Sequence, residues 1–339
     1  MSYSTLGGSQ STISSDNVPG GLDKLRMHHT QALVNAVSAT LYPDAIDTAQ
    51  LYGALVELRR HLESPLAAMH AHPVTETNAA EVAEHILLCW VCARASQADA
   101  QNYSLETIVE TVDRRFDKYA GIPEQSVSET IQCVSYLATM GVGVAAVAQT
   151  SIPASLVLLL SFAECPDVYT SAFRTLAKLC TKHSVRRAQA DGRWESESGR
   201  HAVLDAFTRA QTALRLRNRF DSVATCLFAL VSELASAHYA YKLTPQSTKA
   251  ADGSTPQRVD RAERAVTSAL AFTNALVEAH SSADGRLRMR QELLDTALHR
   301  SLTLLDGPEF ESSRIRMEIR RFRRAYADDI RARDPQPAS

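Results

Sequence analysis

The fold of this protein is decided by the stretch TSIPASLVLLLSFAECPDVYTSAFRTLAKLC, Thr150 to Cys180. An uncharged, leucine-rich run ends at Pro166, and a second apolar series follows at helical spacing. Proline is tolerated in the first turn of a helix because it needs no amide partner there. A helix without charge on any face is expected to be buried on all sides. We therefore predict a buried inner helix over Ile152 to Phe162, with Val168 to Cys180 packed against it.

The same region could be read as a membrane span, because no charged residue occurs between Thr130 and Ala163. However, glycines and a proline divide it, and its continuous apolar part, Leu156 to Leu160, covers only about one and a half turns. No basic cluster closely flanks it to set an orientation. Two helices packed inside a helical stack explain the missing charge better.

The composition favours helices throughout. Apolar residues make up 45% of the chain and charged residues 22%, which is ordinary for a soluble protein. Aromatic residues are only 6%, so alanine and leucine supply the hydrophobicity, and no alternating strand pattern is evident. A formal charge of −2 provides no global attraction to nucleic acid or an acidic membrane. We predict an all-α protein.

The order of patterns along the chain predicts its organisation. A Ser- and Gly-rich start without a secretory signal, and cysteines within apolar helical patterns, indicate a reducing, cytoplasmic location. One helix is expected from Gly285 to Leu305. The predicted divisions are a disordered tail over 1–20, helical repeats over 21–243, a flexible loop over 244–257, further helical repeats over 258–334 and a tail over 335–339.

A loose internal repeat refines the fold class. An apolar helix, a small or polar turn, a short amphipathic piece and a long leucine helix occur in Val134 to Leu160 and again in Leu276 to Leu305. Repeated helical units that each leave an apolar face uncovered gain stability by stacking. The prediction is an armadillo/HEAT-like α-solenoid of stacked helix pairs.

A family resemblance supports this prediction. The segment from about Glu106 to Cys180, centred on IQCVSYLATMGVGVAAVAQTSIPASLVLLLSFAECPDV, resembles the N-terminal armadillo-like region of BEACH-domain proteins, in the branch that carries WD repeats and a FYVE finger. The resemblance implies a scaffold portion and a role in vesicle traffic or selective autophagy. It covers roughly a quarter of the chain. The rest shows nothing similar to the BEACH module, the WD propeller or the FYVE zinc site, and no functional residue is implied.

Possible chemical motifs have structural explanations. Cys89 and Cys92 have the spacing of a zinc or redox pair, but no second ligand pair follows and they lie within a helical pattern. Gly141 and Gly143 match letters of a dinucleotide loop, but a helix precedes them where such a loop needs a strand. The remaining candidates are read as surface groups: the histidines His28, His29, His70 and His72, and the acidic pair Asp328 and Asp329.

We accordingly expect no enzymatic activity, no cofactor, no metal site and no small-molecule substrate. The most promising surface is the C-terminal segment RIRMEIRRFRRAYADDIRARD. Ile315, Ile319, Phe322 and Tyr326 recur at helical intervals, which predicts a helix docked through this stripe. The interaction candidates are Arg316, Arg320, Arg321, Arg323 and Arg324. They could simply face water, or they could bind an acidic membrane surface, RNA or an acidic partner.

These observations lead to one main hypothesis and one alternative. A solenoid forms an extended groove suited to holding macromolecules, so we predict a non-enzymatic scaffold that binds other proteins, in membrane trafficking or selective autophagy. The alternative is a two-lobed nucleic-acid-binding protein of nucleocapsid type. In it, further arginines would share one groove with the C-terminal set: Arg186, Arg187, Arg215, Arg217 and Arg219.

Overall fold

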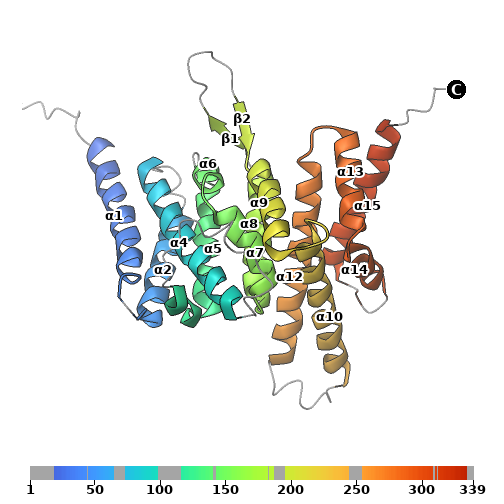
Figure 1. Ribbon diagram of the computed structural model, residues 1–339, viewed down its shortest axis with the longest axis horizontal. Coiled ribbons are helices and arrows are strands. Elements are labelled where there is room, and N and C mark those ends of the chain that lie inside the picture. Colours follow the sequence, from blue (N-terminus) through green and yellow to red (C-terminus); the bar gives the residue numbers. More distant parts are fainter. Residues whose placement is uncertain are drawn as a thin grey trace, which may run out of the picture.

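The computed structural model describes residues 19–43, 45–64, 73–97, 116–139, 143–181, 183–186, 195–243, 254–307, 310 and 312–333. The helices in these ranges succeed one another along a stack that runs from α1 at one end to α15 at the other (Figure 1). The predicted tails, apart from Pro19 and Gly20, and residues 244–253 lie outside the described residues.

Two layers of helices form the stack. In the first layer each helix packs on the next: α2 (Thr48–Glu63), α5 (Glu124–Leu137), α8 (Pro166–Thr181), α12 (Ser254–Glu278) and α15 (Ser313–Arg333). The second layer has the same sequential packing: α1 (Pro19–Ala39), α4 (Pro73–Gln97), α7 (Ile152–Phe162), α10 (Asp221–Leu243) and α14 (Leu298–Leu305). Further helices lie between these in the sequence: η2 (Phe116–Gly121), α6 (Gly143–Ala148), α9 (Arg200–Leu214) and α13 (Ala283–Leu294). This arrangement confirms the predicted all-α, armadillo-like solenoid.

The helix at the centre of the stack is the predicted one. Helix α7 begins at Ile152 and ends at Phe162, and every residue from Ile152 to Leu160 is buried. It packs against α4, α9, α10, α8 and α6, which surround it. Because it has neighbours on all sides, it carries no charge at all. Helix α8 then begins at Pro166, as expected from the Pro-Asp sequence.

The interior is continuous from one end to the other. One cluster of buried hydrophobic side chains extends from Val34 to Phe322. At its centre, Phe272 of α12 lies 5.8 Å from Phe173 and 6.0 Å from Phe207, measured between ring centroids. These rings join α8, α9 and α12. The two lobes of the nucleocapsid-type alternative are therefore not what the described residues form.

A short β-hairpin follows α8. Strand β1 (His183–Arg186) pairs antiparallel with β2 (Glu195–Ser198), with His183 opposite Ser198 and Arg186 opposite Glu195. The hairpin projects from the stack (Figure 1). The sequence prediction missed it because strands of four residues without an apolar face carry almost no periodic signal.

Two predicted helix bounds were wrong. Helix α12 begins at Ser254, so its first turn occupies the end of the predicted loop 244–257. The single helix predicted over Gly285 to Leu305 is divided into α13 and α14. At the break, the Thr296 hydroxyl donates a hydrogen bond to the carbonyl of Leu293 and accepts one from the amide of Leu298. A threonine side chain that bonds locally to the backbone competes with the regular helical pattern.

One helix of the described chain is long and apolar enough to cross a membrane, namely Asp221–Lys242 within α10. It packs against α12, α14 and α7, and 44% of its apolar window is buried in the stack. Core helices of soluble proteins meet the same criterion, so its length and composition are explained by its place in the second layer.

Candidate functional site

A groove crosses the first layer of the stack. It has a volume of about 850 Å³ and is lined by residues of α2, α5, α8 and α12. Each of the last three helices contributes side chains three or four positions apart, which is the spacing of one helix face. The main contributors are Gln125, Ser128, Gln132 and Ser135 of α5, Thr170, Ser171, Arg174 and Lys178 of α8, and Arg261, Arg264, Ser268 and Ala271 of α12.

The polar faces line the groove because the opposite faces are needed for the core. Helix α8, for example, buries Val168, Phe173, Leu176 and Leu179. Its remaining face is left with polar side chains, among them Arg174, which is exposed. Helices α5 and α12 likewise bury one face and turn polar side chains toward the groove, so that three polar stripes lie side by side.

Hydrogen bonds across the groove floor hold neighbouring stripes in register. The ammonium of Lys178 donates to the backbone oxygen of Ser135 at 3.1 Å and to its hydroxyl at 2.7 Å. The hydroxyls of Ser128 and Ser171 lie 3.1 Å apart. These contacts join α5 to α8, so the floor is a prearranged surface of hydroxyl, amide and backbone groups.

Most charged residues of the groove are paired. Asp167 lies 3.7 Å from Arg261, and Glu129 accepts a hydrogen bond of 2.5 Å from Arg59 of α2. Arg174 is different, because it makes no ion pair or hydrogen bond within the described chain. Burial and a hydrogen bond with Glu63 raise the pKa of Tyr136, so its phenol remains neutral at the groove edge. Among the described groove residues, the other cations are thus engaged by carboxylates or by Ser135, and Arg174 is surrounded mainly by hydroxyl and amide groups.

The C-terminal arginines divide into two groups. All five candidates are exposed on α15, whose buried face includes Ile315, Ile319 and Phe322 as predicted. Arg321 donates two hydrogen bonds to Glu278 of α12, and Arg323 pairs with Asp306 after α14. The side chains of the other three make no ion pair or hydrogen bond within the described chain: Arg316, Arg320 and Arg324.

Asp329 was predicted to be solvated together with Asp328, and this prediction is wrong for Asp329. Its carboxylate is buried and is held by two arginines of α13. Arg286 donates through Nε at 2.9 Å and Nη2 at 2.5 Å, and Arg290, which is itself only 1% exposed, donates through Nη1. Burial alone would raise the pKa of Asp329, but the two guanidinium groups outweigh it and lower the pKa. Asp328 is exposed and pairs with Arg331.

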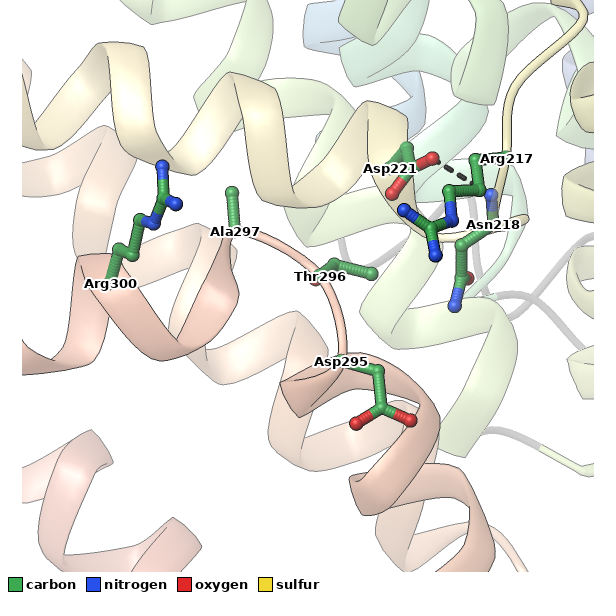
Figure 2. Close-up of a pocket in the computed structure, with 7 residues that line it drawn as sticks. All are labelled: Arg217, Asn218, Asp221, Asp295, Thr296, Ala297 and Arg300. Atoms are coloured by element: carbon green, nitrogen blue, oxygen red, sulfur yellow. Dashed lines mark hydrogen bonds between the residues drawn. The ribbon is translucent and has the colours of Figure 1, made fainter.

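A second depression, of about 580 Å³, lies where the turn after α9 meets the break between α13 and α14 (Figure 2). It carries two cations, Arg217 and Arg300, and two anions, Asp221 and Asp295. Beside it, Arg219 donates two hydrogen bonds of 2.7 Å to Glu292. This region is therefore a joint between repeats with mixed charge.

The joint also shows where the arginines named in the nucleic-acid alternative lie. Arg217 lines this depression together with Arg300, and no arginine of α15 lines it. Arg219 is occupied by Glu292, and Arg215 ends α9 with a left-handed backbone at φ 53°. Arg187 and the side chain of Arg186 lie outside the described residues. Neither this depression nor the groove across the first layer joins the described arginines of this turn to the C-terminal set.

The cysteine pair is part of the core, as expected. Cys89 and Cys92 are 1% and 0% exposed, and burial raises the pKa of Cys92 to about 11. Between them, the indole of Trp90 donates a hydrogen bond of 3.1 Å to the carbonyl of Ile122. His28 and His29 are exposed, whereas His70, His72 and Gly141 lie outside the described residues.

Comparison with known proteins supports the fold. No protein-family model and no curated protein matches the sequence. Among solved structures 33 chains match. One is the crystal structure of E. histolytica Formin1 bound to EhRho1-GTPγS, with a TM-score of 0.52 and 11% identity over 94% of this chain and 84% of that one. The fold is armadillo-like. A designed armadillo repeat protein in complex with the peptide (KR)4 also matches, at a TM-score of 0.35 and 12% identity over 87% of this chain and 99% of that one, which is too low to add to the argument.

The sequence analysis named the arginines but missed the groove. The signal was present as small and polar residues at helical spacing on one face of each of α5, α8 and α12. Such a face is indistinguishable from an ordinary solvated face until the packing of the helices is known.

Proposed function

We propose that this protein is a non-enzymatic scaffold that holds an extended segment of a partner protein in the groove across α2, α5, α8 and α12. The observation that carries the proposal is that three successive helices of one layer turn polar stripes toward the same groove. A chain lying across these helices would meet hydroxyl and amide groups at each step. Gln125 and Gln132 offer both donors and acceptors for its backbone.

The partner class follows from the charges that remain available. Because Arg174 is exposed and unpaired within the described chain, a segment with a carboxylate or phosphate near the middle of the groove is favoured. No catalytic role is proposed. The groove carboxylates Glu129 and Asp167 are engaged by arginines, and Glu124 accepts a hydrogen bond from the amide of Glu164. Cys165 lines the groove and is half-buried, whereas the other described cysteines are buried.

The proposal is tested by affinity purification from the protein's own cells. In the variant Ser171→Tyr with Arg174→Glu, the groove is narrowed and its available charge reversed. The matched control carries Thr208→Tyr and Arg209→Glu, two exposed positions on α9 outside the groove. We expect specific partners with the wild type and the control and their loss with the groove variant. Equal recovery by both variants would rule out the groove, and no partner with any form would rule out the scaffold role.

The cellular role is proposed on the BEACH-type resemblance of residues 106–180 alone. We propose a cytoplasmic place in membrane trafficking or selective autophagy. Proximity labelling with the full chain checks this: enrichment of vesicle-coat or autophagosome proteins over a cytosolic control supports it, and enrichment of neither contradicts it.

A further inference from the structure

The outward face of α15 carries an unneutralised row of positive charge. Arg316, Arg320 and Arg324 are four residues apart, so they follow one face of a continuous helix at intervals of about 6 Å. All three are exposed, and none of their side chains makes an ion pair or hydrogen bond within the described chain. Met317, which is 59% exposed, lies on the same face.

No acidic side chain of α15 neutralises this row. Glu318 and Asp329 are buried on the inner face, where they bind Asn274 and the arginines of α13. Asp328 is exposed but pairs with Arg331. By contrast, Arg321 and Arg323 on the flanks of the helix are paired with carboxylates of neighbouring elements. The flanking arginines therefore bind the helix to neighbouring elements of the stack, whereas the outward arginines form no such ion pairs within the described chain.

The position of α15 restricts the kind of partner. It is the last helix of the first layer and lies at one end of the stack (Figure 1). None of its residues lines the groove of that layer. A row of cations on the convex face of a terminal helix suits a broad anionic surface better than an extended peptide, which needs a groove to enclose it.

We infer that the outward face of α15 binds the surface of a membrane that contains anionic phospholipids. Guanidinium groups pair with phosphate in two parallel hydrogen bonds, so each arginine can hold a lipid headgroup. The unbranched side chain of Met317 can enter the apolar margin of the bilayer beside them. Binding of single-stranded RNA would instead call for aromatic side chains on which bases stack, and the exposed residues of this face include none.

The inference is tested by sedimentation of the full chain with vesicles. Phosphatidylcholine vesicles are compared with vesicles that also contain phosphatidylserine and a phosphorylated phosphatidylinositol. The test variant replaces Arg316, Arg320 and Arg324 with glutamine. Each arginine near an anionic surface strengthens binding by about fivefold, so we expect the triple variant to bind about 100-fold more weakly. Wild-type binding should also fall as salt is added.

A matched control removes the same charge elsewhere. Arg209, Arg217 and Arg300 are exposed and make no ion pair in the described chain, and their replacement by glutamine should leave vesicle binding within a factor of about three of wild type. Equal losses in the two triple variants would show a non-specific charge effect and overturn the inference. Unchanged circular dichroism establishes that each variant is folded.

Met317→Ser separates a membrane from other polyanions. We expect weaker vesicle binding and unchanged binding to single-stranded RNA or polyglutamate, measured by fluorescence anisotropy. Tighter binding of RNA or polyglutamate than of anionic vesicles, lost in the α15 triple variant, would assign the surface to those partners and overturn the membrane proposal. Absence of vesicle binding by the wild-type chain would also overturn it.

Discussion

Removal of the Asp329 carboxylate is the sharpest test of how the C-terminal repeat is held together. In the variant Asp329→Ala, Arg290 keeps its position between α13 and α15, where its side chain is 1% exposed. Its guanidinium lies 5.7 Å from the ring centroid of Phe322 and 5.9 Å from that of Tyr326. These rings compensate part of the positive charge, but they cannot replace a carboxylate.

The magnitude follows from the burial of the charge that remains. Removing one partner of a buried ion pair leaves the other charge without compensation and typically costs about 3–5 kcal/mol. Arg286 is about one quarter exposed at its side chain, so water can solvate it after the change, and it adds little to this cost. We expect Asp329→Ala to destabilise the α13–α15 unit by about 3–5 kcal/mol, with Arg290 responsible for most of the loss.

The neighbouring residue supplies a matched control. Asp328 is exposed and pairs with the exposed Arg331, so Asp328→Ala should cost less than about 1 kcal/mol. The double variant Asp329→Leu with Arg290→Met, which removes both buried charges, should recover most of the stability.

Hydrogen exchange with mass spectrometry measures these effects locally, alongside urea denaturation. In a solenoid the stability of each repeat depends mainly on its interfaces with the neighbouring repeats. Protection of amides from exchange should therefore fall in α13 and α15 and change little in α2 and α5. The lowered pKa of Asp329 means that its stabilising contribution is lost as the pH falls through that lowered pKa. Equal stability of Asp329→Ala and Asp328→Ala would refute the reasoning.

Further changes test the packing and the electrostatics of the stack. Leu158→Ala in α7, where the leucine is fully buried, should cost about 2–5 kcal/mol by urea denaturation, and a loss below 1 kcal/mol would contradict its place in the core. Glu76 of α4 is 3% exposed, neither of its carboxylate oxygens has a hydrogen-bond partner, and burial raises its pKa. Glu76→Gln should therefore stabilise the protein by about 1 kcal/mol at neutral pH. The gain should vanish in acid, where Glu76 is protonated in both the folded and the unfolded wild type. A gain in stability that does not depend on pH would show that the carboxylate charge is not the cause. In Gly199→Ala the new Cβ would lie 2.7 Å from the backbone oxygen of Leu179, so this variant should destabilise the protein by about 1–3 kcal/mol. In Gly53→Ala the new Cβ has nothing within 4 Å, so this variant should stabilise the protein by about 0.5–1 kcal/mol. An equal shift of the melting temperature in the two variants would contradict this reasoning.

The candidate surfaces were predictable to different extents. The arginine cluster was visible in the sequence because its charges are adjacent, and the apolar stripe of Ile315, Ile319 and Phe322 set the side on which the helix docks. Which arginines remain available depends on Glu278 and Asp306, whose carboxylates lie on other elements. The groove depends even more on packing, because its lining is drawn from four separate helices.

The sequence by itself determined the class of fold and its central helix. The uncharged leucine run that opens with Pro153 and ends before Pro166 has the length and composition of a helix, and a helix without charge on any face is buried on all sides. Tertiary structure alone decided that Asp329 is buried while Asp328 is exposed, and that Arg321 and Arg323 are paired with carboxylates of other elements. The periodicity of a sequence shows which face of a helix avoids water, whereas the partner of a buried charged side chain depends on which distant element packs beside it.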